Sequence, residues 1–322
     1  MNRRRFLRSA MALGLGVTAF PALAQAYPAR PVKLIVPFPA GGPLDIVGRA
    51  IGDKLAASLK QPFILENRAG AAGNLGTEAV AKAAPDGHTL LIVLGTTLTA
   101  NPWLYKALPF DPVKDLRPLS ILTRNSLMLA VHPSVPVNSV AELVAFARKQ
   151  PISYAHAGRG SPGHLVMEYF RLKAGFEADP VPYRGNAPLV TDLLGGQIKL
   201  AFVNTAGLVQ HVRDGRLKGL AISSSTRSEM APAVPTVAES GYPGFEVGSH
   251  FVMLAPAGVP ESVAVLLEQQ VRAATSSLGF ADKFRAQDIA VVGSSAAEAR
   301  EFLRADTALW ARIAKDANLR VD

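Results

Sequence analysis

This sequence alternates short apolar runs with stretches of helical periodicity, and that alternation restricts the fold more than any other feature. Apolar residues at 32–36, 63–65 and 89–93 predict buried strands. Between them, residues 46–59 and 75–83 carry apolar side chains three and four positions apart, which predicts helices. The resulting βαβαβ order indicates a mainly parallel sheet with helices on both faces.

The same pattern begins again in the second part of the chain. Strands are predicted at 127–131, 152–154, 181–183, 198–203, 217–222 and 252–254, and helices at 139–147, 165–170, 189–194, 263–271 and after the capping box at Ser295. Residues 232–248 are rich in Pro and Gly, which predicts connecting loops. We therefore expect an α/β protein with two lobes. Residues 27–127 plus 249–322 would form the first lobe and residues 128–248 the second, with a ligand cleft between them.

The first 26 residues have the pattern of an export signal. Four arginines precede an apolar stretch at 10–23, and the small-x-small sequence at 24–26 is typical of a cleavage site. The segment at 2–8 is also typical of twin-arginine export, so this route and ordinary secretion both stay open. The apolar stretch is short for a membrane-spanning helix, and a retained N-terminal anchor is the alternative. We expect the mature protein in the periplasm.

Charge and cysteine content exclude several function classes. The formal net charge of +9 falls to +5 once the four leader arginines are removed, and the remaining charges are dispersed. Nucleic-acid-binding proteins gather positive charge on one face, so no nucleic-acid partner is predicted. The balance is compatible with attracting anions. The chain has no cysteine, which excludes disulfides, thiolate catalysis and Cys-based metal sites.

A glycine-rich loop at 38–45 joins the first predicted strand to the first predicted helix. Gly41 and Gly42 allow a tight turn and a close approach of the backbone to a ligand, and Pro43 suits the first helical position. Free amides at a helix start form a site for anions, and the charge of Asp45 suits the helix dipole and could cap amides. An ordinary strand-to-helix turn is the alternative.

A second loop, at 157–164, repeats this design in the second unit. Gly158 and Gly160 precede a capping Ser161 and a proline at the predicted helix start. One such loop in each unit predicts that both face the cleft and bring amides to a carboxylate ligand. With Gly163 the loop also spells G-x-G-x-x-G, but the acid that a dinucleotide site needs at the end of the next strand is missing. No cofactor is therefore predicted.

Polar residues also follow other predicted strands. Thr96, Thr97 and Asn101 could hydrogen-bond a carboxylate or hydroxyl group, or could simply end a strand. Arg184 could pair with a carboxylate in bidentate fashion, or could be a solvated surface arginine. Asn204 follows a strand in the same unit.

The sequence lacks the usual signatures of an enzyme. No Walker A loop occurs, and Arg159 replaces the first glycine that a G-x-S-x-G elbow around Ser161 would need. None of the six histidines lies at metal-ligand spacing from a nearby acid, so no metal is predicted. The chain is therefore predicted not to be an enzyme; an exported α/β hydrolase with a Ser-His-Asp set drawn from distant positions is the alternative.

A series of ordered motifs spans nearly the whole mature chain. They lie at 27–28, 35–42, 66–73, 85–87, 101–105, 108–112, 163–165, 181–185, 192–197, 234–236 and 255–258, together with Asp45 and Arg49. In these motifs the sequence resembles the substrate-binding proteins of the tripartite tricarboxylate transporters, also called the Bordetella uptake gene family.

The resemblance implies a type II periplasmic-binding-protein fold with two lobes and a hinge. It implies a monomer that captures a small organic carboxylate, such as a di- or tricarboxylate, and delivers it to a two-component integral membrane permease. A periplasmic protein that signals to a receptor kinase stays open as an alternative. By motif position, the implied ligand-binding residues are Phe38, Ala40, Gly41, Gly42, Asp45, Thr96, Thr97, Asn101, Gly158, Gly160, Ser161, His164, Arg184, Gly185, Asn186, Ala187 and Asn204.

The chain departs from the family pattern in its distal, solute-selecting region. Val203 stands where many members carry aspartate, which removes a partner for an amino group and points away from amino-acid ligands. His156 replaces a frequent serine, His250 a frequent tryptophan and Arg184 a frequent lysine. Donors at Arg159, Arg184 or His250 would favour a second carboxylate.

Overall fold

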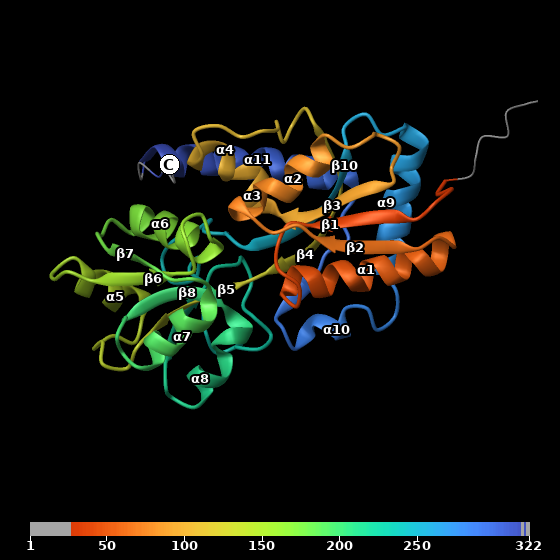
Figure 1. Cartoon of the computed structure of the whole chain (residues 1–322). Coiled ribbons are helices and arrows are strands. Elements are labelled where there is room, and N and C mark those ends of the chain that lie inside the picture. The colour runs from red at the N-terminus through yellow and green to blue at the C-terminus, as the bar shows by residue number, and fades with distance from the viewer. Residues whose placement is uncertain (1–26, 317–318, 320–322) are drawn as a thin grey trace, which may run out of the picture.

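The computed structural model describes residues 27–316 and 319, and the predicted export signal at 1–26 lies outside them. Figure 1 shows two lobes, each with a central sheet flanked by helices. The first sheet has the order β11 (Ile289–Val291), β4 (Leu116–Asn125), β10 (Ser249–Pro256), β3 (Thr89–Leu94), β1 (Val32–Val36) and β2 (Phe63–Asn67). The second has the order β7 (Asp179–Pro182), β6 (Ser153–His156), β8 (Leu200–Asn204), β5 (Leu127–Val131) and β9 (Lys218–Ile222). The two-lobed α/β class is confirmed.

Helices cover both faces of the two sheets. Those described in the first lobe are α1 (Pro43–Leu59), η1 (Ala71–Gly73), α2 (Asn74–Ala81), α3 (Gly95–Thr99), α4 (Asn101–Leu104), α9 (Glu261–Thr275), α10 (Asp282–Arg285) and α11 (Ala296–Asp316). Those in the second lobe are α5 (Val140–Ala147), α6 (Pro162–Ala174), α7 (Asn186–Leu194), η2 (Thr205–Gly207) and α8 (Val209–Arg213). Pro43 and Pro162 occupy helix starts, as predicted.

The expectation of mainly parallel sheets needs a correction, because both sheets are mixed. β1 pairs in parallel with β2 and β3, but β10 is antiparallel to β3 and β4. In the second sheet β6 is parallel to β7 and β8, whereas β5 is antiparallel to β8 and β9. β4 and β5 are separated only by Ser126 and belong to different sheets, and β10 returns to the first sheet. Strands that cross between lobes are not bound by the βαβ connection that keeps neighbours parallel.

Alternating side chains of the first sheet enter two cores. Leu34 and Ile92 pack with α1 and α9 on one face, while Ile35 and Leu91 pack with α2 and α3 on the other. The second sheet likewise packs α5 and α6 on one face and α7 and α8 on the other. This two-sided burial explains the continuous apolar runs of the central strands.

The last helix, α11, connects the two lobes. It lies along β4 and α3 of the first lobe, and its Trp310 and Ile313 enter the core of the second lobe. The indole of Trp310 donates a hydrogen bond to Asp306 over 3.1 Å, and Thr99 of α3 donates to the same carboxylate over 2.6 Å. Burial raises the pKa of Asp306 although both bonds act against that rise. α11 thus packs against both lobes and joins them.

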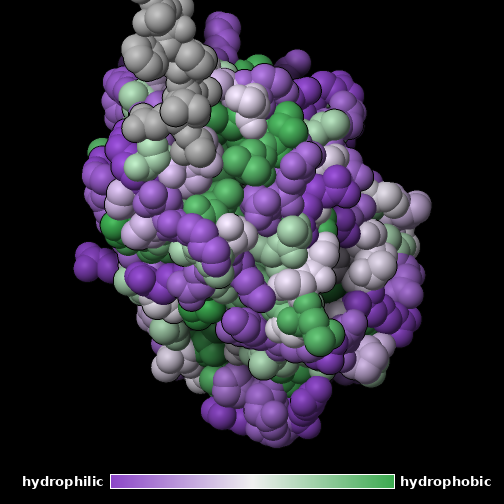
Figure 2. Space-filling view, turned by 90° about the vertical axis from the view of Figure 1, so that its right-hand side faces the viewer, coloured by the Kyte–Doolittle hydropathy of each residue, from purple (hydrophilic) through white to green (hydrophobic). Residues whose placement is uncertain are grey.

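The face that carries α9 and the outer ends of β1 and β2 is mostly hydrophilic, with hydrophobic residues in small groups among polar ones (Figure 2). Ile64, Val265 and Leu278 are exposed hydrophobic residues of these elements and the loop that follows α9. Over residues 27–316 and 319, no helix combines the length and the apolar character that crossing a bilayer requires.

The two tryptophans of the chain allow the role of α11 to be tested. Trp310 is 2% exposed and Trp103, on α4, is 46% exposed. We expect W310A to lower the free energy of unfolding by about 3–5 kcal/mol, because it opens a cavity in the second core. W103A should cost roughly 1 kcal/mol or less. Urea unfolding would measure both; equal losses would show that Trp310 does not anchor α11.

Candidate functional site

A buried carboxylate organises the loop between β1 and α1. Asp45 is 3% exposed, in the first turn of α1. Its Oδ2 accepts hydrogen bonds from the Gly41 amide and from Arg49 Nε, each over 3.0 Å. Its Oδ1 accepts from Arg49 Nη2 and from Asn67 Nδ2, also over 3.0 Å. The carboxylate is therefore saturated by its own loop, by its own helix and by the end of β2.

These bonds set the charge of Asp45 and the shape of the loop. Burial alone would raise the pKa of the Asp45 carboxyl, but the hydrogen bonds from Arg49, Gly41 and Asn67 outweigh it and hold the pKa below its ordinary value. Asn67 Nδ2 also donates to the Phe38 carbonyl over 3.0 Å, which pins the start of the loop. The sequence-based expectation that Asp45 caps amides is met at Gly41. Arg49 and Asn67 belong to the matched motifs, but we had not assigned them to the site.

The loop leaves amides without partners where α1 begins. The backbone at Ala40 and Gly41 is exposed, and Gly41 has a φ of 82°. Gly42 is the N-cap of α1 without a side-chain cap. The amides of Leu44 and Asp45, in the first turn, have no acceptor among the described residues. Such amides are the usual donors of an anion site at a helix start.

A tight turn after β2 brings a third loop against the first. Four consecutive residues, Gly70 to Gly73, have positive φ, and two of them are alanines, Ala71 at 46° and Ala72 at 51°. The Ala72 carbonyl accepts hydrogen bonds from Thr97 Oγ1 over 3.0 Å and from Asn101 Nδ2 over 3.3 Å. A strained turn of this kind persists only where its surroundings hold it. The predicted residues Thr97 and Asn101 therefore hold this turn with their side-chain donors.

The glycine loop of the second lobe is held by two histidines. Gly158 N donates to His156 Nδ1 and Gly160 N donates to His164 Nδ1, each over 3.2 Å. The two imidazole rings lie 4.4 Å apart between centroids. The tautomers follow from these bonds: Nδ1 is the acceptor in each ring. Two amides that we expected to face a ligand thus donate within their own loop.

Burial keeps both imidazoles neutral. It lowers the pKa of His156, and it lowers the pKa of His164 to about 4, where the nearby His156 acts in the same direction. Beneath them, Glu168 accepts from Tyr154 over 2.5 Å and forms a two-bond ion pair with Arg171. Each neutral ring can therefore accept a hydrogen bond at Nδ1 from its loop amide, His156 from Gly158 and His164 from Gly160.

Ser161 fulfils only part of its predicted role. It occupies the N-cap of α6, but its hydroxyl makes no cap hydrogen bond, which corrects the expectation of a side-chain cap. Ser161 Oγ is buried and has no hydrogen-bond partner among the described residues. A methyl group added at Gly160 would lie 3.4 Å from Leu104 of the first lobe, so this loop reaches across to α4.

A cavity of about 420 Å³ lies between the two lobes, and we call it the amide cavity. Pro43 and Gln287 line it from the first lobe. Its second-lobe lining is Asn186, Ala187, Val190, Val203, Asn204, Ala206 and Gly207. Three predicted site residues, Asn186, Ala187 and Asn204, therefore meet the helix start that follows the first glycine loop. No motif in the sequence around Gln287 predicted that it would line this cavity.

Other predicted residues do not line this cavity. Arg184 is exposed, and Gly185 forms the N-cap of α7 with a φ of 103°. Thr96 is buried on α3. His250 is buried against the Phe302 ring, at 4.3 Å between centroids, and burial lowers its pKa to about 3.

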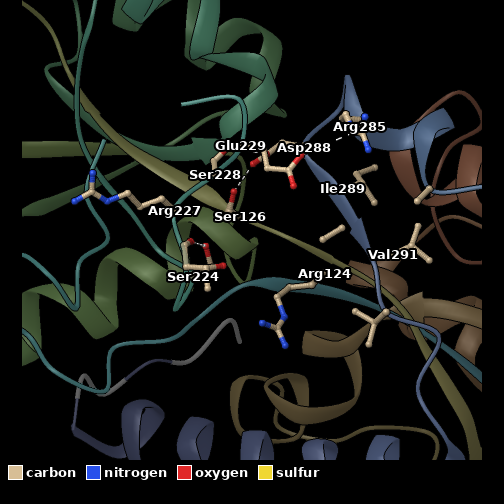
Figure 3. Close-up of a pocket in the computed structure, with 14 residues that line it drawn as sticks. Arg124, Ser126, Ser224, Arg227, Ser228, Glu229, Arg285, Asp288, Ile289 and Val291 are labelled. Atoms are coloured by element: carbon tan, nitrogen blue, oxygen red, sulfur yellow. Dashed lines mark hydrogen bonds and ion pairs between the residues drawn. The ribbon is translucent and has the colours of Figure 1, made fainter. Parts of the chain in front are cut away.

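A second cavity, of about 530 Å³, lies at the hinge and is shown in Figure 3. It includes three arginines, but each is paired: Arg124 with Glu246, Arg227 with Glu239, and Arg285 with Asp282 and Glu229. Asp288 and Ser126 also line this hinge cavity. Gln287 lines the amide cavity, and the next residue, Asp288, lines the hinge cavity. The backbone at these two residues therefore lies between the two cavities.

Two α/β lobes joined by crossing strands, with open amides at a helix start and a cavity lined by both lobes, are the architecture of a two-lobed solute-binding protein. The chain belongs to the family described as the tripartite tricarboxylate transporter family receptor, whose model matches residues 47–319. Protein BugT of Bordetella pertussis is 37% identical to it over 306 residues, which cover 94% of each chain. The family resemblance seen in the sequence is confirmed.

Solved structures agree with this assignment. Rpa4515 of Rhodopseudomonas palustris, solved with adipate, is 33% identical and superposes with a TM-score of 0.80 over 92% of this chain and 100% of its own. MatC of the same organism, solved with bound malate, is 30% identical and has a TM-score of 0.75 over 89% of this chain and 99% of its own. Both are carboxylate complexes of the same fold.

The role of Asp45 can be tested by removing its charge. We expect D45N to lower the free energy of unfolding by about 1–3 kcal/mol at neutral pH, because an amide cannot satisfy the same four donors. Folding lowers the pKa of Asp45, so its charge stabilises the folded state. This stabilisation is complete above the unfolded-state pKa of about 3.9 and is lost as the pH falls through the folded-state pKa. The gap between wild type and D45N, followed by urea unfolding, should close in acid. D53N, an exposed change on the same helix, is the control; a gap that persists in acid would contradict the ion-pair role.

The loop histidines predict a second pH dependence. Folding lowers the pKa of His164 to about 4, so the stability that its neutral ring contributes is complete above about 6.5 and is lost as the pH falls toward the folded value. In H164N the amide oxygen can replace Nδ1 as the acceptor for Gly160. Between these two pH values wild type should lose on the order of 3 kcal/mol more stability than H164N. H211N, which makes the same substitution on α8, is the control in this experiment. Identical pH profiles for wild type and H164N would contradict the burial of a neutral ring.

Proposed function

We propose that this protein is an extracytoplasmic receptor that captures a small organic acid between its lobes and delivers it to a two-component membrane permease of the tripartite tricarboxylate type. The observation that carries the proposal is the start of α1. There the amides of Leu44 and Asp45 have no acceptor among the described residues, and the neighbouring Pro43 lines the amide cavity. A carboxylate placed there would satisfy donors that the fold leaves open.

The proximal carboxylate would bind to the first glycine loop. Ala40, Gly41 and Gly42 supply exposed or half-exposed backbone there, while Asp45 holds that backbone in place. Across the cleft, the second lobe contributes the Ser161 hydroxyl, which is buried and has no hydrogen-bond partner among the described residues. Capture would begin on the first lobe, and closure would follow from contacts that only the closed state makes.

Dicarboxylates are the first ligands to consider. Two relatives with at least 30% identity were solved with adipate and malate. The amide cavity has no acidic side chain in its lining, and Val203 is part of its wall. An ammonium group would therefore find no counter-charge there, which supports an organic acid over an amino acid.

The predicted leader and the family together support a periplasmic site of action. Members of this family include periplasmic binding proteins, and the family is that of a transporter's receptor. If delivery to a permease is the role, deletion of the receptor gene should abolish uptake of the bound acid at concentrations below its dissociation constant.

Thermal unfolding with a panel of acids tests the binding role. We expect adipate, malate or another di- or tricarboxylate to raise the melting temperature by several degrees, since a ligand at 100 times its Kd stabilises by about 2.7 kcal/mol. Amino acids should leave it unchanged. The absence of any shift, together with mass spectrometry that finds no co-purified acid, would overturn the proposal.

The glycine loop can be tested in the same assay with a matched pair of variants. Gly41 and Gly241 both have positive φ, at 82° and 102°, and an added side chain would meet no atom within 4 Å at either position. G41V and G241V should therefore suffer similar strain, but only G41V should lose ligand stabilisation, because only Gly41 lies in the proposed loop. Normal ligand stabilisation of G41V would remove this loop from the site.

A further inference from the structure

Three side-chain carboxamides with no partner surround the amide cavity. Asn186 begins α7, Asn204 ends β8, and Gln287 lies between α10 and β11 of the other lobe. None of the three side chains has a hydrogen-bond partner among the described residues. Asn186 is exposed, and Asn204 and Gln287 are only partly buried, so the amide groups of all three are available to a polar group of a ligand that enters the cavity.

The side chains that line the amide cavity indicate which ligand groups could bind there. The remaining lining side chains are apolar or absent, and none carries a charge. Each carboxamide offers two N–H donors and one acceptor oxygen. A carboxylate or hydroxyl oxygen could accept from these donors, whereas an ammonium would meet only amide oxygens. The wall therefore suits the oxygen-bearing distal end of an organic acid.

Gln287 is held in place by the residue that follows it. Asp288 has a left-handed backbone with a φ of 53°, which a side chain rarely adopts without support. Its carboxylate accepts hydrogen bonds from Ser126, at the crossing between the lobes, and from Ser228 of the second lobe, the latter over 2.5 Å (Figure 3). Both bonds fix the backbone next to Gln287.

The same chain of hydroxyls reaches the other side of the cavity. Ser126 Oγ lies 2.8 Å from Thr205 Oγ1, in hydrogen-bond contact, and Thr205 directly follows Asn204. Ser228, Asp288, Ser126 and Thr205 thus form a continuous hydrogen-bonded series behind the cavity. Two members of this series directly follow lining residues along the chain: Asp288 follows Gln287 of the first lobe, and Thr205 follows Asn204 of the second.

We propose that Gln287 is a specificity-determining residue that recognises the distal oxygen-bearing group of the ligand, and that Asp288 is the positioning residue that holds it. This assignment rests on the proposed function. Gln287 approaches the cavity from a lobe opposite to Asn186 and Asn204, so it contacts the distal group only when both lobes hold the ligand. It therefore links recognition of that group to the closed arrangement.

Isothermal titration with two diacids and their half-esters tests Gln287. The probes are adipate, succinate and the monomethyl ester of each, since esterification neutralises one carboxylate, adds a single methyl group and leaves the other carboxylate free. Q287E places a carboxylate against the distal group, and it should weaken binding of the bound diacid by on the order of tenfold or more. Binding of the corresponding half-ester should change by no more than about twofold. Q269E, the same charge change at an exposed position of α9, should leave both affinities as in wild type.

The outcomes separate this assignment from the proposed function. Suppose that wild type binds a diacid, and that Q287E weakens binding of the diacid and of its half-ester equally or weakens neither. Gln287 then does not recognise the distal group, and the assignment of Gln287 is overturned while the proposed function stands. If wild type binds none of the four probes, the assignment of such acids to the cavity fails together with this one.

Asp288 is tested by the ratio of diacid to half-ester affinity. D288A and S228A should both lower this ratio several-fold, because they release the backbone that positions Gln287. A purely structural role would lower the melting temperature and leave the ratio unchanged, and that result would overturn the positioning role.

Discussion

The pairing of one buried carboxylate sets the geometry on which the first lobe's site depends. A buried charge without a partner lowers the stability of the folded state by several kcal/mol, so the fold must place hydrogen-bond donors around the Asp45 carboxylate. The donors come from the loop before it, from the next turn of α1 and from the end of β2. The same pairing leaves the first-turn amides of α1 unused, because the only backbone amide from which the carboxylate accepts, among the described residues, is that of Gly41, outside the helix. The charge of Asp45 is paired, while the first-turn amides of α1 have no acceptor among the described residues.

The second lobe stabilises a similar loop with neutral acceptors. His156 and His164 accept from Gly158 and Gly160, and burial keeps both rings uncharged. The side chains that accept from this loop therefore carry no negative charge, and the Ser161 hydroxyl has no partner among the described residues. The two loops resemble each other in sequence but differ in their hydrogen bonds. The first is followed by backbone amides that have no acceptor among the described residues, whereas in the second two amides donate to histidines of the same loop region.

The sequence predicted the lobes better than the contacts within them. Central strands such as 32–36 and 127–131 were found because burial on both faces makes them continuously apolar. β4 was missed because Pro118 and a register shift interrupt it, and proline argues against a central strand. The histidine acceptors depend on side-chain orientation within a loop, which spacing does not specify. Gln287 joins the cavity through tertiary contacts made more than 80 residues beyond Asn204, so no local pattern marks it.

A ligand in the amide cavity would touch both lobes at once. Pro43 and Gln287 belong to one, and Asn186 and Asn204 to the other. A ligand can shift an equilibrium only by its different affinity for the two states, so contacts supplied by both lobes are what make binding depend on lobe closure. The Asp288 bonds to Ser126 and Ser228 lie on the hinge side of that cavity and oppose separation of the same elements. If Gln287 selects the ligand as proposed, hinge stability and ligand selection share one stretch of backbone, and a substitution that changes one should also change the other.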